Sequence, residues 1–303
     1  SDSIPILAFF FKFISSMMPE KFQYHSIWYF ICFFLQLYFS HKILYKFTKN
    51  NSYSLIGSLF FLISPIFVFR IGMHSALAGQ WILLLTLNLV LTKKYEQSKL
   101  IWIFVLSLSS LIHFYFTLII SIVFVTFRFF NFFIYKEKFL HFTKDFFITF
   151  VCLFLVMYIA GYFEIRTVDA LGLGYGAMKL NLLSIFDPIV ASKGLAWSWI
   201  LPDIKLSPAE DMSGFNYLGL GQILMILVSL FLFLRNKKDK NFSNFNNGIE
   251  IKIFIWISLL LTLLALSNKI SLGAYTLIEI PLNKYIYAAL SFMRASGRLF
   301  WIV

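Results

Sequence analysis

Apolar runs long enough to cross a bilayer alternate with short basic stretches along most of the chain. A hydrocarbon core of roughly 30 Å needs about 20 apolar residues in a helix, and His25–Tyr45 is the first such run. Later runs predict crossings over Ser52–Arg70, His74–Thr92, Phe146–Tyr162, Tyr217–Leu234 and Ile251–Leu266. The pattern predicts an all-α fold, namely a polytopic transmembrane helical bundle that forms a single domain over residues 1–303.

One apolar stretch does not fit a simple crossing. Leu100–Ile134 contains 35 residues, which would extend about 52 Å as a helix at 1.5 Å per residue. That length is long for one crossing and short for two. We therefore expect two shortened helices that meet near His113-Phe114-Tyr115, and a further span that begins at Arg298.

The basic residues predict the orientation of these spans. Lysine-rich stretches mark cytoplasmic loops, and this assigns residues 46–51, 93–99, 135–145 and 235–250 to the cytoplasm. Residues 1–24, 164–216 and 267–297 become external segments, which we expect to be helical. The cytoplasmic side then carries 15 Lys and Arg residues and 5 acidic residues, and the external side carries 11 Lys and Arg residues and 9 acidic residues. This excess of basic residues inside agrees with the positive-inside rule.

Composition narrows the protein class further. Hydrophobic residues make up 60% of the chain and charged residues 13%, about half the usual share in a soluble domain. This excludes a soluble enzyme, a disordered chain and a disulfide scaffold. The net charge is +12. The Lys and Arg residues lie between apolar runs and do not cluster on a soluble face, so they predict no nucleic-acid partner. We interpret Cys32 and Cys152, both within apolar runs, as small buried hydrophobic residues.

The two ends predict a piece of a longer protein. The chain begins at Ser1 without a methionine, and its last residues lie inside an apolar run. Because the orientation places Asp2 outside, we expect that a preceding crossing has been lost, together with a C-terminal part.

Ionisable residues gather on the predicted external side, where an enzyme acting on a lipid carrier would meet a phosphate at headgroup depth. Such an enzyme needs cations for the phosphate and a carboxylate or imidazole for a proton. Arg70 and His74 fit these roles, although both could simply anchor a hairpin at the interface. His113 interrupts an apolar run and could instead be a packing residue, and Gln80 could bond across helices.

Two further candidates lie near the ends of the chain. Arg294 and Arg298 are four residues apart, so on one face of an α-helix N-terminus they would form a phosphate clamp; the alternative is an ordinary basic flank. Asp2 precedes a helix that starts near Pro5, so it could supply a carboxylate or only a cap.

Short motifs on the external side occur in an ordered series. They are Asp2-Ser3-Ile4-Pro5, Phe22-Gln23-Tyr24, Ser64-Pro65 with Arg70 and His74, Gly174-Tyr175-Gly176, Asn181-Leu182-Leu183, Asp187-Pro188, Gly214-Phe215-Asn216-Tyr217-Leu218-Gly219-Leu220-Gly221 and Arg294–Arg298. In this order the chain resembles a family of bacterial polytopic membrane proteins grouped with the GT-C glycosyltransferases. The acid that precedes the glycine-rich stretch in that family is displaced here, because Met212 and Ser213 follow Glu210-Asp211.

The resemblance implies a GT-C-like hexosyltransferase that uses a polyprenyl-phosphate-linked sugar and a glycan or lipid acceptor. It implies a multi-pass protein among the lipids of the bacterial inner membrane, with a periplasmic active site. Asp2 would be the base or the ligand of a divalent cation (Mg or Mn), with a partner acid upstream of Ser1. The other implied catalytic residues are His74 and His113, and the implied substrate-binding residues are Arg70, Gln80, Tyr175, Asn181, Asn216, Tyr217, Arg294 and Arg298.

Two other functions stay open at this stage. One is a transporter or flippase of lipid-linked saccharides, which would place ionisable groups near the middle of the membrane and often carries inverted repeats. The other is a protein resembling O-antigen polymerases or ligases, which also use external arginines. Convergence of Asp2, His74, His113 and Arg294 in one external cavity would favour the transferase.

Overall fold

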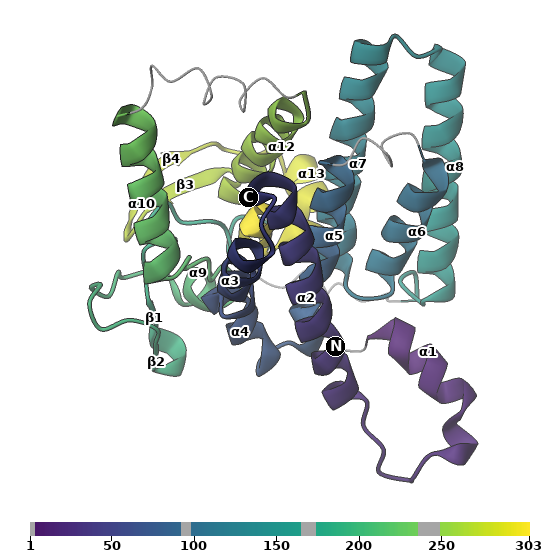
Figure 1. The fold of residues 1–303 in the computed structure, drawn as a ribbon, viewed down its shortest axis with the longest axis horizontal. Helices are drawn as coiled ribbons and strands as arrows, with labels where there is room; N and C mark the ends of the chain where they lie inside the picture. The colour runs from purple at the N-terminus through teal and green to yellow at the C-terminus, as the bar shows by residue number, and fades with distance from the viewer. Residues whose placement is uncertain (1–3, 92–97, 165–173, 236–248) are drawn as a thin grey trace. The chain divides into compact units, whose positions relative to one another are not determined.

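The chain is predominantly helical and divides into two compact units. A computed structural model describes residues 4–91, 98–164, 174–235 and 249–303 (Figure 1). Unit 1 comprises Ser1–Ile63 and Phe67–Arg166, and unit 2 comprises Ser64–Ile66 and Thr167–Val303. The prediction of a helical bundle is confirmed at this coarse level.

Unit 1 is built from apolar helices joined by short turns. Its elements are α1 (Pro5–Phe13), η1 (Ser15–Met17), α2 (His25–Thr48), α3 (Asn51–Leu62), α4 (Pro65–Ile71, whose first two residues cluster with unit 2), η2 (Ser75–Ala78), α5 (Trp81–Val90), α6 (Lys99–Ser110), α7 (Phe114–Tyr135) and α8 (Phe139–Ile159). Helices α2, α7 and α8 are long and apolar enough to cross a membrane. The predicted span that begins at His25 is therefore confirmed, three residues longer than expected.

The predicted crossing Ser52–Arg70 is broken instead of continuous. Helices α3 and α4 are bent by 52° at the residues before Pro65. Proline lacks a backbone N–H and disfavours a helical conformation in the residue before it. The Ser64-Pro65 pair therefore ends one helix and begins another, a feature that the length of the apolar run did not reveal.

The predicted break near His113 is confirmed, but the two helices are unequal. Helix α6 ends at Ser110, and α7 begins at Phe114 and continues for 22 residues. Only α6 is short. The predicted loop over 135–145 is also wrong in extent, because α8 begins at Phe139 and its first two turns occupy most of that range.

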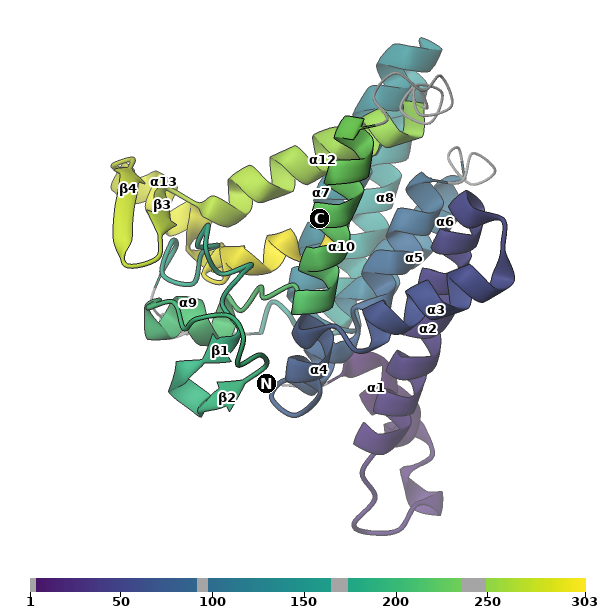
Figure 2. The same cartoon turned by 60° about the vertical axis from the view of Figure 1, so that its left-hand side comes forward.

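Unit 2 combines two apolar helices with short hairpins and 3₁₀ turns (Figure 2). Its elements are β1 (Ile189–Val190), η5 (Ala191–Lys193), β2 (Leu195–Ala196), α9 (Pro208–Ser213), α10 (Leu220–Arg235), α12 (Ile249–Leu266), β3 (Lys269–Leu272), β4 (Tyr275–Glu279), α13 (Lys284–Leu290), η6 (Ser291–Met293) and η7 (Ser296–Ile302). Helix α12 is a fourth candidate membrane span, and it confirms the predicted run Ile251–Leu266.

The expectation of helical external segments is wrong in two places. Strands β1 and β2 form one antiparallel hairpin, and β3 and β4 form another. In the second hairpin Leu272 pairs with Tyr275 across a two-residue turn, in which Gly273 has a φ of +58°. Glycine adopts this left-handed conformation without a steric penalty, and such turns favour hairpins over helices.

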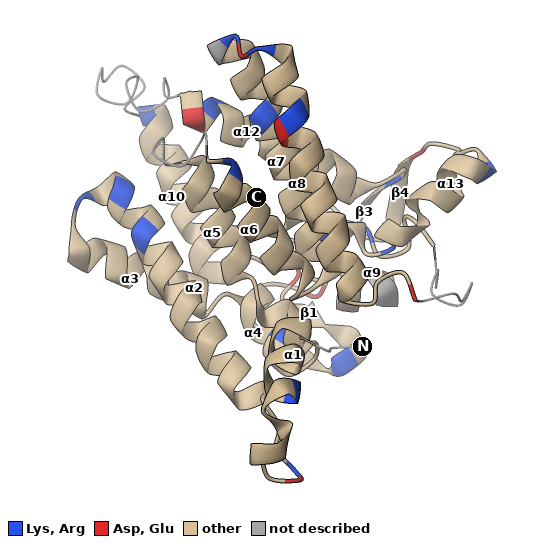
Figure 3. Cartoon of the chain, turned by 90° about the vertical axis from the view of Figure 1, so that its right-hand side faces the viewer, with Lys and Arg blue, Asp and Glu red and all other residues tan. Residues whose placement is uncertain are grey.

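The exposed apolar side chains and the placement of the basic residues are typical of a membrane protein. Helices such as α10 expose large apolar side chains over nearly their whole length, which suits contact with lipid. In unit 1 the basic side chains gather mostly toward one end of the long helices (Figure 3). The predicted loops 93–99 and 235–250 lie largely outside the described residues.

Candidate functional site

Three turns of unit 1 come together at one place. The amide of Ile6, at the start of α1, donates to the carbonyl of Leu111 at 3.0 Å. A Cβ atom at Gly79 would lie only 2.8 Å from Ile112 Cγ2 and 3.0 Å from Trp28 Cζ2, so the η2–α5 turn packs directly on the α6–α7 break. We call residues 4–6, 74–80 and 111–115 the turn cluster.

His113 closes the start of α7 within the turn cluster. Its Nδ1 accepts a hydrogen bond from the Tyr115 amide at 3.2 Å, and its ring stacks on the Tyr115 ring with centroids 5.8 Å apart. Because Nδ1 is the acceptor, the neutral imidazole carries its proton on Nε2. The helix cap thus fixes the orientation of the His113 ring.

Ser75 anchors the turn that carries His74. The Trp28 indole donates to the Ser75 carbonyl at 2.7 Å, and the Tyr29 hydroxyl lies 2.6 Å from Ser75 Oγ. His74 itself precedes η2, and its carbonyl accepts from the Leu77 amide at 2.9 Å. The position of the His74 backbone is therefore set by side chains of α2.

Arg70 and Gln80 are buried polar side chains on either side of this turn. Arg70 is 1% exposed, and its guanidinium carbon lies 4.9 Å from the centroid of the Phe69 ring. Its backbone carbonyl accepts from the His74 amide at 3.0 Å, which joins the end of α4 to the turn that carries His74. Gln80 is 8% exposed and precedes α5. Burying a cation among apolar helices is costly. Arg70 is therefore a candidate functional residue at this end of unit 1.

The segment 178–182 connects distant parts of unit 2 through backbone hydrogen bonds. Met178 is joined by backbone hydrogen bonds to Arg294 (3.3 Å) and Gly297 (3.0 Å), and the Leu180 amide donates to the Ala265 carbonyl at 2.9 Å. One extended segment thus fixes the end of α12 and the η6–η7 turn. The absence of a side chain at Gly297 permits this approach, because a Cβ there would lie 3.0 Å from the Lys179 carbonyl.

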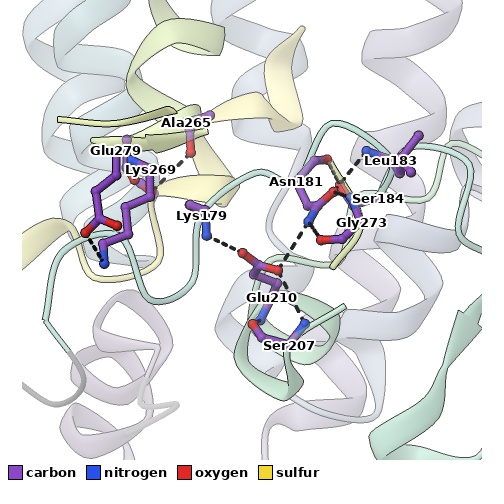
Figure 4. Close-up of polar contacts among 12 residues, drawn as sticks. Lys179, Asn181, Leu183, Ser184, Ser207, Glu210, Ala265, Lys269, Gly273 and Glu279 are labelled. Atoms are coloured by element: carbon purple, nitrogen blue, oxygen red, sulfur yellow. Dashed lines mark hydrogen bonds and ion pairs between the residues drawn. The ribbon is translucent and has the colours of Figure 1, made fainter. Parts of the chain in front are cut away.

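A buried ion pair joins the segment 178–182 to α9. Lys179 Nζ pairs with Glu210 Oε1, and the two side chains are 8% and 5% exposed (Figure 4). Glu210 also closes a capping box with Ser207 at the start of α9. Sequence reasoning gave Glu210 no role because of its displaced position. The Ser207-x-x-Glu210 spacing was the available signal, since it is typical of a helix start.

Asn181 belongs to the same network. Its Nδ2 donates to the Gly273 carbonyl at 2.9 Å and to Glu210 Oε2 at 3.3 Å, and its Oδ1 accepts from the amides of Leu183 and Gly273. These four bonds use both donor hydrogens and both lone pairs of the amide. Substrate binding by Asn181, which the sequence predicted, would require one of these bonds to break.

Arg294 and Arg298 do not share one helix face as predicted. Arg294 follows η6 and is exposed, whereas Arg298 lies within η7 and is 8% exposed, with its guanidinium 5.9 Å from the Trp301 ring centroid. The physical reason is the helix type. The two arginines do not belong to one α-helix, because Arg294 and Ala295 separate the 3₁₀ helices η6 and η7. The paired clamp is therefore corrected to two arginines in different environments.

The remaining candidates of unit 2 are buried aromatic and amide side chains. Tyr175 is 7% exposed, and burial raises the pKa of its phenol. Asn216 and Tyr217 are 0% and 1% exposed. Among the described residues, Asn216 Oδ1 and the Tyr217 hydroxyl find no hydrogen-bond partner.

The predicted site residues thus form two groups. Arg70, His74, Gln80 and His113 belong to unit 1, and the other described candidates belong to unit 2. That all of them line one chamber stays a prediction. Asp2, predicted as base and metal ligand, lies outside the described residues. Within the ranges that the structure describes, no three His, Cys, Asp or Glu side chains are grouped to hold a metal ion.

Comparison with known proteins places the chain in a family without assigning a reaction. No curated protein and no solved structure matches it. A family model does match, over residues 1–303. The chain therefore belongs to the family described as domain of unknown function (DUF6311).

Proposed function

We propose that this chain is a GT-C-like glycosyltransferase of the bacterial inner membrane, which transfers a sugar from a polyprenyl-phosphate donor to a glycan or lipid acceptor on the periplasmic side. The observation that carries the proposal is the turn cluster. Within it, the α6–α7 break that carries His113 packs on the 74–80 turn, and the buried Arg70 lies four residues before His74, the first residue of that turn. Cations and N–H donors at the end of an apolar bundle suit a phosphate presented at headgroup depth.

The reaction places definite demands on these groups. An acceptor hydroxyl attacks the anomeric carbon, the bond from that carbon to the phosphate oxygen breaks, and polyprenyl phosphate leaves with inversion. A base takes the hydroxyl proton, and the resemblance assigns this role to Asp2. The leaving phosphate gains negative charge, which nearby guanidinium groups stabilise. In this scheme Arg294 and Arg298 bind the donor phosphate.

The cap geometry refines the role of His113. Because Nδ1 accepts from the Tyr115 amide, the start of α7 fixes the orientation of the ring. In the proposed reaction His113 is one of the catalytic residues that the resemblance implies, held at the break between α6 and α7.

The experiment uses the full-length protein in vesicles with labelled polyprenyl-phosphate hexoses. His113→Asn retains an N-cap acceptor, because asparagine is a preferred cap, but removes the Nε2 donor. We expect His113→Asn, Asp2→Asn and Arg294→Ala each to lower transfer by about 100-fold or more. His141→Asn, on the exposed start of α8, is the matched control and should retain full transfer. Unchanged transfer in His113→Asn and Asp2→Asn, at normal expression, would reject the site.

A second candidate is transport of lipid-linked saccharides. It is favoured by the two interrupted helix pairs, α3–α4 with its 52° bend and α6–α7 with its break at His113, because transporters often bind substrate at broken helices. Movement of an intact labelled lipid-linked saccharide between leaflets, without release of polyprenyl phosphate, would support this function. An O-antigen polymerase or ligase activity would instead appear as joining of two lipid-linked glycans.

A further inference from the structure

The loop after the first hairpin of unit 2 exposes an apolar tip. Trp199 is 93% exposed, Ile200 is 78% exposed and Leu195 is 44% exposed. No charged residue occurs from Gly194 to Pro202. We call residues 195–200 the Trp199 tip. An indole exposed to this degree is unusual for a surface that faces only water.

The base of this loop is held firmly. The Trp197 amide donates to the Pro188 carbonyl at 2.8 Å, and the Trp197 ring packs against Phe215 with centroids 6.2 Å apart. Asp187 Oδ1 accepts from the Ile204 amide at 3.4 Å on the far side of the loop. The exposure of the tip is therefore a fixed feature of the fold, since both arms of the loop are tied to residues 187–188.

The same contacts join the tip to the start of a lipid-facing helix. Phe215 is five residues before Leu220, where α10 begins, and the Leu218 amide donates to the Ile185 carbonyl at 3.2 Å. Nearly every large apolar side chain of α10 is exposed. Both views show β1 and β2 near the end of α10 that begins at Leu220 (Figures 1 and 2). The tip thus lies close to the level at which α10 would leave the bilayer.

We propose that the Trp199 tip inserts into the interfacial region of the lipid bilayer, where Trp199 and Ile200 contact the boundary between headgroups and acyl chains. Tryptophan is enriched at this depth because its ring is apolar and its N–H is polar. Lys193 and Lys205 flank the tip and are exposed, so their ammonium groups can remain at the phosphates. The inference rests on the membrane fold and not on sugar transfer.

Size favours lipid over a protein partner at this tip. An aromatic side chain offers about 150–250 Å² of surface, so one indole with two aliphatic neighbours falls well short of the roughly 800 Å² per partner in a stable protein interface. A few apolar side chains are sufficient for interfacial anchoring when helices already hold the protein in the membrane.

The test measures the depth of the tip in the reconstituted full chain. Cys32 and Cys152 are replaced by alanine, and an environment-sensitive fluorophore is attached at Trp199→Cys or, as the matched control, at Asp203→Cys in the same loop. We expect nitroxide lipids labelled high on the acyl chain to quench the probe at position 199 at least twofold more than the probe at 203. Aqueous iodide should show the opposite order. If the cysteine-free chain does not fold, the native cysteines are kept and the labelling of the unmutated chain is subtracted.

Two results would overturn the inference. Equal quenching of both probes by iodide, with no excess quenching by lipid at 199, would show that the tip lies in water. A probe at 199 that is shielded from iodide but not quenched by nitroxide lipid would show that a protein surface, including a second copy of this chain, covers the tip.

Discussion

Lys99 and Asp145 form an ion pair of 3.2 Å although 46 residues separate them. The pair joins the first residue of α6 to the first turns of α8. Arg128 of α7 extends the group, because it binds Glu137 at 2.8 Å and lies 3.7 Å from Asp145. The starts of α6 and α8 therefore lie at the same end of unit 1, as the predicted topology requires of residues 99 and 135–145.

This relationship leads to a prediction about sidedness. A cysteine at exposed Lys144 should be labelled by a membrane-impermeant maleimide only after the inner face is opened, whereas a cysteine at exposed Lys193 should be labelled in intact cells. The reason is that short lysine-rich loops remain in the cytoplasm. Labelling of both positions from the same side would contradict the topology and, with it, the periplasmic site.

The buried pair of Lys179 and Glu210 predicts strong coupling in stability. Lys179→Met leaves an unpaired buried carboxylate, and Glu210→Gln leaves an unpaired buried ammonium, so each should lower the free energy of unfolding by about 3 kcal/mol or more. The double variant should lose much less than the sum, because neither charge remains. Chemical denaturation of the purified protein in detergent measures all three. Additive losses would show that the two charges do not stabilise each other.

The glycines around the Lys179 carbonyl predict a steric effect. A Cβ at Gly214 would lie 2.8 Å from the carbonyl oxygens of Lys179 and Glu210, and one at Gly297 would lie 3.0 Å from that of Lys179. Backbone atoms cannot yield easily, so we expect Gly214→Ala and Gly297→Ala each to destabilise the protein by about 1–3 kcal/mol.

Gly72 provides the matched control, because a Cβ there meets nothing within 4 Å. Gly72→Ala should change the unfolding free energy by no more than about 0.5 kcal/mol. If all three alanine variants have the same unfolding free energy as the unmutated chain, unit 2 is not closely packed around Lys179.

Tyr175 predicts a pH effect at the alkaline end. Burial raises the pKa of its phenol, so the folded state retains a proton that the unfolded chain loses above about pH 10. The stability associated with this proton is complete below that pH and falls as the pH rises further. Thermal unfolding between pH 8 and pH 11 should therefore show an alkaline decrease that is smaller in Tyr175→Phe. Parallel pH profiles for the two proteins would refute the effect.

Local signals in the sequence predicted several features well. The apolar runs beginning at His25 and Ile251 became α2 and α12 because run length and hydropathy act within a single segment. The break near His113 followed from a length that suits neither one crossing nor two. Pro65 carried an equally local signal, but the apolar run around it concealed the bend between α3 and α4.

The candidate site depended more on contacts between distant residues. His113 was identified as a polar interruption of an apolar run, but the packing of the α6–α7 break on the turn at Gly79 could not be inferred from spacing. Glu210 was set aside although it joins Lys179, Asn181 and Ser207 in one network. The hairpin at Gly273 was missed because its short strands were read within an external segment expected to be helical.

The amino-acid pattern alone was sufficient for the membrane class of this protein, for the runs that became α2 and α12 and for the break near His113. These properties follow from hydrophobicity, proline and glycine within stretches of about 20 residues. The three-dimensional fold was needed to show that Asn181 binds a turn 92 positions away, that Lys179 pairs with Glu210 and that Arg294 is exposed whereas Arg298 is buried. Such contacts depend on how separate elements pack, which no local pattern of residues encodes.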